Sequence, residues 1–534
     1  MYRCCAIATL FLSTVLTPFS RGQNPIQTEN AKAGTSGWQL SNPATNREIE
    51  GYASLTSVNI GGSINFSVST SSSTFKIEIF RTGWYGGVGA RLLMTVNNVA
   101  GVRRNTPSPD ANGMVECNWP SSYTLNVPNS WVSGIYLARL TASSGKQSYI
   151  IFVVRDDNRA YSDIVFESSV TTFEAYNFWP GGANGKSLYD WAPGGRAWKV
   201  SFNRPYVLGY SYDSNQWGVS SGVGAGEFLA NLQPGPDQSY PIPAAGWEYN
   251  LVRWLEKNGY DVTYLTDIDV HENASLISWP QHSVFVSAGH NEYWSRAMRQ
   301  NVQNALGTVS GQGLSLGFFG SNTLYWQIRL ESSPKNGAAD RTIVCYKYDA
   351  PNNDPQYYSN PSVATVRWRD PQVNQIETEL VGVGYFGDPW EGDMIINNSG
   401  HWLLNGSGLS NGDHLPGVSG YEVDGGWNPQ NEPSGIEYVN STSVGPFSDD
   451  FDNPPGLSCN TQTCHNDITF YRASGSFAPV FATGSFNWSW GLDNYNSGSS
   501  GSASLRSAFA SKGVQVITAN ALDCLINWGD SCGS

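Results

Sequence analysis

The chain has 534 residues, a formal net charge of -14 and a sequence pI of about 4.9. Because it has no run of Lys or Arg that could neutralise phosphates, its composition excludes nucleic acid as an expected partner. With 40% hydrophobic and 14% charged residues the composition also excludes a disordered chain, and the length predicts two or more globular domains.

The first 22 residues have the pattern of a secretory signal peptide. Arg3 precedes an apolar run over residues 4–15, and Pro, Ser and Gly residues follow that run. The run is shorter than the roughly 20 residues that a membrane-spanning helix needs. We therefore expect a secreted, extracellular protein that has no membrane partner and begins, after cleavage, with a polar, extended leader over residues 23–50.

Residues 51–157 predict a small antiparallel β-sandwich. Short alternating runs separated by turn residues mark six strands, at 63–69, 75–80, 91–96, 122–127, 134–141 and 149–154. The segment Arg81-Thr-Gly-Trp-Tyr-Gly-Gly lies between the second and third of them. We interpret it as a bend covered by aromatic rings in preference to a binding loop.

Residues 158–534 predict an α/β domain. Runs typical of strands alternate with runs typical of helices, which predicts right-handed crossovers and a mainly parallel sheet covered on both faces. The expected strands are 164–167, 262–265, 283–287 and 314–319, and the expected helices are 247–258 and 295–306.

The remainder of this domain predicts an insertion and a return to the core. Residues 340–480 are rich in Gly, Asn, Pro and Ser, with strand-like runs at 364–368 and 468–472. We expect a β- and loop-rich insertion there, followed by a helix at 505–512 and a strand at 514–517.

Cysteine and asparagine patterns fit a secreted protein. Two of the eight cysteines lie in the expected signal peptide, and the remaining six are an even number, as disulfides require. The expected pairs are Cys459–Cys464, Cys524–Cys532 and, as a tie between domains, Cys117–Cys345. Glycosylation triplets predict a glycoprotein with mostly exposed acceptor residues. They begin at Asn65, Asn273, Asn397, Asn405, Asn440 and Asn487.

Polar residues follow four of the expected strands, at the edge of an open α/β sheet where ligands bind. The most informative segment is Gly289-His290-Asn291-Glu292-Tyr293-Trp294-Ser295. A histidine titrates near neutral pH, and a glutamate can act as a base or a metal ligand. The alternative is that Asn291 or Glu292 only serves the N-terminus of the next helix. The other segments are 171–177, 266–269 and 320–322.

Familiar catalytic motifs are missing from the sequence. It contains no HExxH, no P-loop, no GxGxxG after the first strand of the α/β domain, and no GxSxG elbow at the end of an expected strand. Serine-hydrolase and dehydrogenase chemistry are therefore disfavoured. Several tyrosines precede the histidine motif, and each one alone is more often a packing residue. They are Tyr176, Tyr189, Tyr206, Tyr210 and Tyr212.

Several ordered motifs together resemble a known family, the C-terminal region of N,N-dimethylformamidase large (beta) subunits. The resemblance implies an Ig-like β-sandwich followed by a class I glutamine amidotransferase-like, flavodoxin-like α/β domain with an insertion. The motifs are Phe80-Arg-Thr-Gly-Trp-Tyr-Gly-Gly, Ala175-Tyr-Asn, Ser187-Leu-Tyr-Asp, Val200-Ser-Phe-Asn-Arg-Pro-Tyr206, the histidine segment, Gly320-Ser-Asn322, Gly420-Tyr-Glu422 and Trp488-Ser-Trp-Gly-Leu-Asp493.

The resemblance also implies a cofactor, a mononuclear ferric ion held by two tyrosines and a glutamate. By motif, the ligands in this chain are Tyr176, Tyr206 and Glu292, with Tyr189 in a competing motif for the second tyrosine. All three ligand atoms would be oxygens.

The remaining matched residues, His290, Asn322 and Glu422, would be catalytic. The implied mechanism is metal-assisted hydrolysis of a C–N bond in a small amide. Glu422 or His290 would pass a proton to the leaving amine, and Asn322 would hold the developing oxyanion. The function we expect is therefore that of a secreted, iron-dependent amidase.

Two other functions are compatible with the sequence. One is a non-catalytic extracellular protein that binds glycans or surfaces through its 20 Trp and 27 Tyr residues. The other is a carbohydrate-active hydrolase with a carboxylate pair such as Asp267 and Glu292. The sequence also leaves a homo-oligomer open.

Overall fold

The computed structural model describes residues 23–190, 192–207, 222–229, 246–426, 431–445, 459, 463–495, 509–528 and 532. The expected signal peptide lies outside the described residues, and so do Tyr210 and Tyr212. No helix in the described part of the chain is long and apolar enough to cross a membrane.

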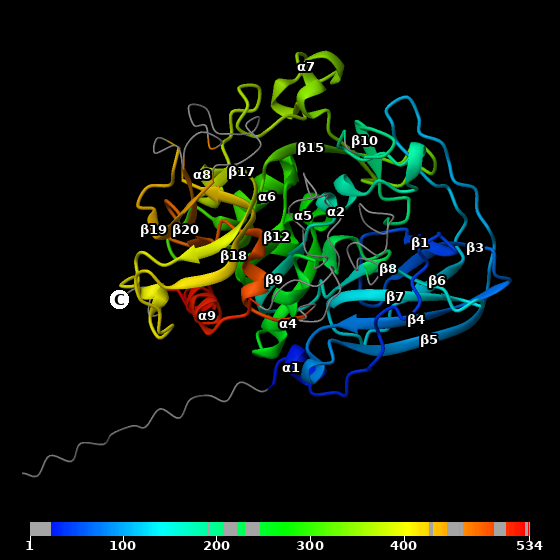
Figure 1. The fold of residues 1–534 in the computed structure, drawn as a ribbon, viewed down its shortest axis with the longest axis horizontal. Coiled ribbons are helices and arrows are strands. Elements are labelled where there is room, and N and C mark those ends of the chain that lie inside the picture. The colour runs from blue at the N-terminus through cyan, green and yellow to red at the C-terminus, as the bar shows by residue number, and fades with distance from the viewer. Residues whose placement is uncertain are drawn as a thin grey trace, which may run out of the picture.

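The N-terminal part is a two-layered β structure, and all six expected strands are present. One layer has the order β1-β3-β6 and the other the order β2-β8-β7-β4-β5 (Figure 1). Ile64 and Phe66 of the first layer share a buried cluster with Ile77 and Phe152 of the second. The strands are β1 Ile49–Ala53, β2 Ser57–Asn59, β3 Ser63–Thr70, β4 Thr74–Thr82, β5 Ala90–Ala100, β6 Tyr123–Asn126, β7 Gly134–Ala142 and β8 Gln147–Arg155.

The leader that we expected to be extended contains a short helix, α1 (Pro25–Asn30). Asn24 caps its first turn by accepting a hydrogen bond from the Gln27 backbone N–H at 2.8 Å, and Ile26 is fully buried. A capping residue followed by a proline in the first turn is a helix start signal, and the overall composition of the segment does not reveal it.

The second part is built on a seven-stranded sheet of order β11-β9-β12-β14-β21-β20-β19. Its first five strands pair in parallel, as expected, and the last two pairings are antiparallel. The protein is therefore β plus α/β in class. The strands are β9 Ser162–Ser168, β11 Val262–Thr266, β12 His282–His290, β14 Ser315–Ser321, β19 Glu437–Val444, β20 Cys464–Arg472 and β21 Pro479–Ala482.

Helices cover both faces of this sheet. Ile164 of β9 shares a buried cluster with residues of α4 (Tyr249–Lys257) and α9 (Lys512–Asn527). Its neighbour Val165 points to the other face and shares a cluster with residues of α5 (Asp267–Glu272) and α6 (Arg296–Leu306). This alternation is the period-2 pattern of a strand that is buried on both sides.

The insertion is less separate from the core than expected, because β19 and β20 extend the main sheet. The run 364–368 forms no strand. Its Trp368 N–H donates to the Tyr325 carbonyl, and its Thr365 carbonyl accepts from the Lys347 N–H. Because its hydrogen bonds go to two different segments, the run forms no ladder with either. Two smaller sheets complete this part. They contain β10 Lys199–Ser201, β13 Tyr293–Ser295, β15 Trp326–Glu331 and β16 Thr342–Val344, and β17 Gly384–Ile395 with β18 His414–Gly425.

The predicted strand 514–517 is wrong, because these residues belong to α9. Ser511 caps this helix, and Val514, Ile517 and Leu525 are all fully buried. Their helical spacing places them on one face, which outweighs the β propensity of the Val-Gln-Val-Ile run. Of the predicted helix 505–512, residues 505–508 lie outside the described chain and only Lys512 is helical.

Two of the three expected disulfides are present, Cys459–Cys464 and Cys524–Cys532. The third prediction is wrong, because Cys117 and Cys345 are separate buried thiols. Buried cysteines often act simply as small apolar residues. Among the triplet asparagines, Asn440 and Asn487 are only 1% exposed, whereas the other four are exposed.

A buried ion pair joins the β layers to the α/β part. Nη2 of Arg81 lies 2.7 Å from Oε1 of Glu256 on α4, and both side chains are fully buried. Arg81 also donates to the Ser133 carbonyl at 2.8 Å, and Tyr264 donates to Glu256 at 2.9 Å. The Arg81 segment is therefore a structural bend, as interpreted.

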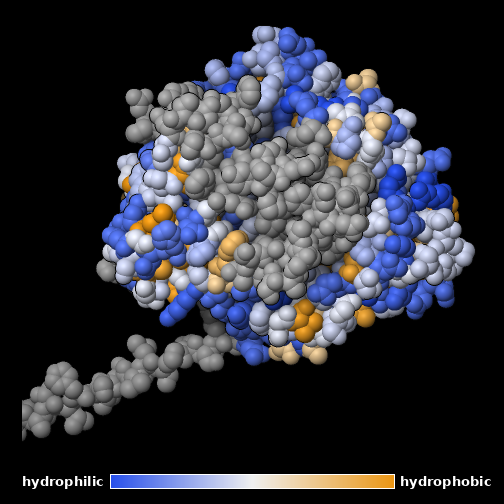
Figure 2. Space-filling model, in the orientation of Figure 1, coloured by the Kyte–Doolittle hydropathy of each residue, from blue (hydrophilic) through white to orange (hydrophobic). Residues whose placement is uncertain are grey.

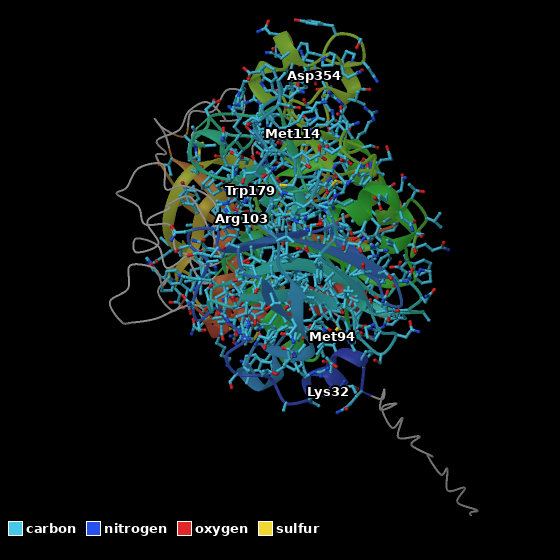
Figure 3. All side chains as sticks on the ribbon, turned by 90° about the vertical axis from the view of Figure 1, so that its right-hand side faces the viewer. Lys32, Met94, Arg103, Met114, Trp179 and Asp354 are labelled. Carbon is cyan, nitrogen blue, oxygen red and sulfur yellow. A yellow bond between two sulfur atoms is a disulfide. The ribbon has the colours of Figure 1, made fainter. Side chains whose placement is uncertain are left out.

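Trp179 makes a second connection, in the middle of the molecule (Figure 3). Its Nε1–H donates to Glu50 of β1 at 2.8 Å, and its ring lies edge-on to Trp119 at 5.8 Å. Lys32 beside α1 and Asp354 beside α7 (Ala350–Asn353) lie at opposite ends in the same view. The face drawn in Figure 2 is mostly hydrophilic, with scattered small apolar patches among the described residues.

We predict that Glu256→Gln lowers the free energy of unfolding by about 3–5 kcal/mol, because it leaves the Arg81 charge buried without a counter-charge. The matched control is Glu331→Gln, which removes a carboxylate that is 43% exposed beside Lys199 and should cost less than about 1 kcal/mol. Urea unfolding followed by tryptophan fluorescence measures both. Equal losses would show that the buried pair does not hold the two parts together.

Candidate active site

The carboxyl ends of three parallel strands meet at one edge of the main sheet. In the register of β12 and β14, His290 is paired with Ser321, so Glu292 and Asn322 follow from adjacent strand ends. β9 pairs with β12 on its other side and leads into α2 (Val170–Tyr176). The sheet therefore brings the 171–177, 288–294 and 320–322 segments together, as the sequence predicts.

The last turn of chain in β12 requires a glycine, and the residues that follow it do not cap the next helix. Gly289 has φ +65°, and a Cβ there would lie 2.3 Å from the Cβ of Trp247. The helix α6 is capped by Ser295, whose hydroxyl accepts from the Met298 N–H at 3.1 Å. Asn291 donates to Glu167 at 2.6 Å, and Glu292 turns toward α2. The alternative that these two residues serve the helix N-terminus is therefore wrong.

Two buried carboxyl groups hold the beginning of α2. Glu248 accepts from the Ser169 N–H at 2.8 Å, and Asp267 accepts from the Thr171 N–H at 2.8 Å and from its hydroxyl. Tyr176 lies at the opposite end of the same helix. Asp267 is thus engaged with Thr171 at the beginning of α2, whereas Glu292 contacts Tyr176 at the end of the same helix.

Three oxygen-bearing side chains converge at the end of α2. The Tyr176 hydroxyl donates to Glu292 Oε2 at 3.0 Å, and the Tyr189 hydroxyl lies 2.9 Å from the same oxygen. The two tyrosine hydroxyls are 2.5 Å apart, and their rings are stacked at 4.3 Å. Tyr293 donates to Tyr189 at 2.5 Å. The described part of the site is buried: Tyr176 is 5% and Glu292 3% exposed.

Tyr206 is placed elsewhere. Its ring packs edge-on against Phe173 at 6.4 Å, and it lines a different cavity with Arg204 and Arg341. In the described structure, Tyr189 occupies the position beside Glu292 that the sequence motif offered to Tyr206.

The three predicted catalytic residues lie close together. Nε2 of His290 lies 3.1 Å from Glu292 Oε2 and 3.9 Å from Glu422 Oε2, and its Nδ1 lies 3.8 Å from Glu227. Asn322 donates to Glu422 at 2.6 Å. His290, Asn322 and Glu422 are thus brought together at the strand ends.

Electrostatics separate the roles of the two glutamates. Burial alone would raise the pKa of Glu292, but its contact with His290 and the charge of Lys347 lower it below its ordinary value. Burial, Asp388 and Glu292 raise the pKa of Glu422 well above its ordinary value. Burial and Glu292 likewise raise the pKa of Tyr176 and Tyr189. These opposite shifts favour the ionised form of Glu292 and the protonated form of Glu422.

This donor set fits a hard cation better than a soft one. No group of three His, Cys, Asp or Glu side chains in the described ranges could hold a metal ion, so the donors on offer are phenol oxygens and one carboxylate. The Tyr176, Tyr189 and Glu292 oxygens lie within 3.0 Å of one another. An ion there would replace the hydroxyl protons, because ligands bind metals in their deprotonated form.

Sequence reasoning missed two residues of the site. Glu227 follows the glycine-rich run 222–226 and faces His290, although no motif marks it. Lys347 is 2% exposed, and its Nζ lies 3.3 Å from the ring centroid of Tyr189. A run of glycines before a lone acid was the only signal for Glu227, and the sequence offered none for Lys347.

Comparisons with known proteins agree with the motifs. Residues 76–500 match the family model described as N,N-dimethylformamidase beta subunit-like, C-terminal. The curated N,N-dimethylformamidase beta subunit of Paracoccus aminophilus is 22% identical over 427 residues, which make up 71% of this chain and 53% of that protein. This chain thus spans about half the length of that relative.

A search of solved structures aligned a Paenibacillus sp. cycloisomaltooligosaccharide glucanotransferase, crystallised with cycloisomaltoheptaose. The alignment covers 66% of this chain and 62% of that chain, with 10% identity and a TM-score of 0.16. A score this low supports no shared fold.

The carboxyl groups that hold α2 predict how stability depends on pH. Burial raises the pKa of Asp267 from 3.8 to about 8 and that of Glu248 from 4.5 to about 7. At a pH between its unfolded and its folded pKa, each group is protonated in the folded protein and ionised in the unfolded protein. Its stabilising contribution is therefore complete below its unfolded pKa and decreases by about 1.4 kcal/mol per pH unit until pH reaches the folded pKa.

We predict that Asp267→Asn makes the free energy of unfolding decline less steeply between pH 5 and 7.5. Asp190→Asn, which changes a side chain that is 77% exposed, is the control and should keep the wild-type slope. Urea unfolding at a series of pH values gives the slopes. A slope in Asp267→Asn equal to that of wild type would contradict the assignment of a buried, protonated Asp267.

Proposed function

The chain belongs to the N,N-dimethylformamidase beta subunit-like, C-terminal family, and on that basis we propose that it is a secreted, iron-dependent hydrolase of the C–N bond in a small linear amide. The family relationship suggests amide hydrolysis, and the Paracoccus aminophilus relative is named for it. Iron, secretion and the choice of amide are our own inference.

One observation carries the proposal: two phenol oxygens and one carboxylate converge in a buried position at the strand ends. Buried tyrosine hydroxyls usually satisfy separate partners. Here both point at the same carboxylate, which suits a shared cation. We therefore assign Tyr176, Tyr189 and Glu292 as the ligands, with Tyr189 in place of Tyr206.

The chemistry that a ferric ion supplies at such a site is Lewis-acid polarisation of the amide carbonyl. The group on which Glu422 is placed to act is the leaving amine. The raised pKa of Glu422 favours the protonated form, and its Oε2 lies 3.9 Å from Nε2 of His290, so we propose that Glu422 delivers its proton to the departing amine nitrogen. Hydrolysis then consumes one water and releases a carboxylic acid and an amine.

Asn322 has a different role from the expected one. Its amide Nδ2 donates to Glu422 Oε2 at 2.6 Å, and its backbone N–H donates to Asp424 at 2.8 Å. These contacts fix Asn322 and orient the carboxyl group of Glu422. We therefore propose Asn322 as the residue that positions the acid and not as the donor to the oxyanion.

His290 is positioned between the acid and the ligand carboxylate. Its ring packs 4.3 Å from Phe486 and 5.2 Å from Tyr176, which holds the imidazole plane. Nε2 can therefore exchange a hydrogen bond with Glu292 while remaining near Glu422. In this arrangement His290 links the two carboxyl groups and can move a proton between them.

We predict that the purified secreted protein contains about one iron per chain and shows a broad visible absorption from tyrosinate bound to ferric iron. Glu292→Gln and Tyr189→Phe should each lose the iron and the absorption, because the first removes the negative charge of the carboxylate ligand and the second removes a ligand oxygen. Tyr260→Phe removes a hydroxyl from a partly buried ring beside Trp254, away from the site, and is the matched control. Elemental analysis and a visible spectrum measure both quantities.

Retention of iron in Tyr189→Phe together with loss in Tyr206→Phe would restore the ligand set read from the sequence motif. A wild-type protein that stays free of iron after ferric iron is supplied would overturn the metal-dependent hydrolase. An amide screen with formamides and acetamides then tests the reaction itself on the iron-containing protein.

We predict that Glu422→Gln keeps the iron but lowers kcat on the best amide by about 10²- to 10⁴-fold, because it removes the proton donor. The glutamine retains an oxygen that can accept from Asn322, so the fold around it should persist. Iron content and turnover measured on the same sample separate the two effects. Full turnover in this variant would exclude Glu422 as the acid.

A further inference from the structure

Arg341 is a buried cation at the boundary between the β layers and the α/β part. It is 3% exposed and precedes β16. Its Nε donates to Asn203 at 2.9 Å, and its Nη2 donates to the carbonyls of Ala53 and Phe202 at 2.8 and 2.9 Å. These three acceptors are neutral, so they leave the charge uncompensated.

Other buried arginines in the described structure are paired with carboxylates. Arg81 has Glu256, Arg204 has Glu174, and Arg369 has Glu377. No carboxylate of the described residues lies within 4.0 Å of Arg341. The acids that act on it from further away are Glu174, which pairs with Arg204, and Glu116, which accepts from Asn203 at 3.0 Å. Burial lowers the pKa of Arg341 to about 10.

This arginine lines a small cavity. The cavity has a volume of about 30 Å³, enough for about two waters, and Tyr52, Val170, Phe202 and Tyr206 also line it. The Tyr206 hydroxyl and Nη1 of Arg341 have no hydrogen-bond partner among the described residues. Leu55, Thr56 and Arg341 are shared with an adjoining cavity of about 290 Å³.

We propose that this cavity binds a small carboxylate, whose anionic group pairs with Arg341 and accepts from the Tyr206 hydroxyl while its remainder extends toward the larger cavity. A buried charge is stable in a protein only when a counter-charge or ligand compensates it. Nη1 of Arg341 and the nearby Tyr206 hydroxyl are the donors left for such a group, and a planar guanidinium matches the planar carboxylate.

This site is separate from the proposed active site and does not depend on it. Val170 at the beginning of α2 lines the cavity, whereas Tyr176 at the end of the same helix belongs to the tyrosine cluster. The proposal needs neither iron nor turnover. Its failure would leave the amidase proposal intact, and the reverse also holds.

The test is calorimetric titration of the secreted protein with sodium propionate, with sodium chloride and sodium phosphate at equal ionic strength as the comparison anions. We expect saturable binding of propionate only. Arg341→Gln should abolish it. Tyr206→Phe, which keeps the ring and its packing on Phe173, should weaken it by about tenfold through loss of one charge-assisted hydrogen bond. Tyr260→Phe should bind as wild type does.

Three results would overturn the proposal. They are no propionate binding by wild type, propionate affinity in Tyr206→Phe equal to that of wild type, or equal binding of chloride. Loss of binding in Glu292→Gln with retention in Tyr206→Phe would also overturn it, because the carboxylate would then occupy the active site as a product does. Tyr206→Phe keeps the proposal testable if Arg341→Gln does not fold.

Discussion

The parallel pairing of β9, β12 and β14 is the constraint on which the rest of the site depends. It fixes the relative height of three strand ends to within two residues, about 7 Å, although β9 and β14 are more than 100 residues apart in sequence. Tyr176, Glu292 and Asn322 all follow from those ends. Their convergence is therefore a property of the sheet, and loops only supply the partners that complete it.

Burial of so many acidic groups at this edge has an electrostatic consequence. Glu227, Glu292 and Glu422 all face His290, and Lys347 is the cation that acts on Glu292 from within the cluster. A second anion brought to this position would meet strong repulsion, whereas a neutral polar molecule would not. The described residues at this position therefore favour a neutral polar molecule or a cation over an anion.

Sequence periodicity predicted the parts of the structure that the main chain determines. The strands that end at Ser168 and His290 and the helix from Arg296 are strongly patterned, so their order and the meeting of their ends followed. The path between Tyr176 and Tyr206 has no such pattern. It is set by tertiary contacts such as Arg204 with Glu174, which motif spacing cannot convey. For this reason the second tyrosine beside Glu292 was Tyr189.

A cluster of aromatic rings packs beside His290. Phe486 stacks beside the imidazole, and Trp247 lies 5.1 Å from Phe486 and 4.9 Å from Trp490. These rings are fully or almost fully buried and offer no charged group. These apolar rings therefore shield one side of the His290 imidazole from water, which strengthens its electrostatic interaction with the carboxyl groups that face it.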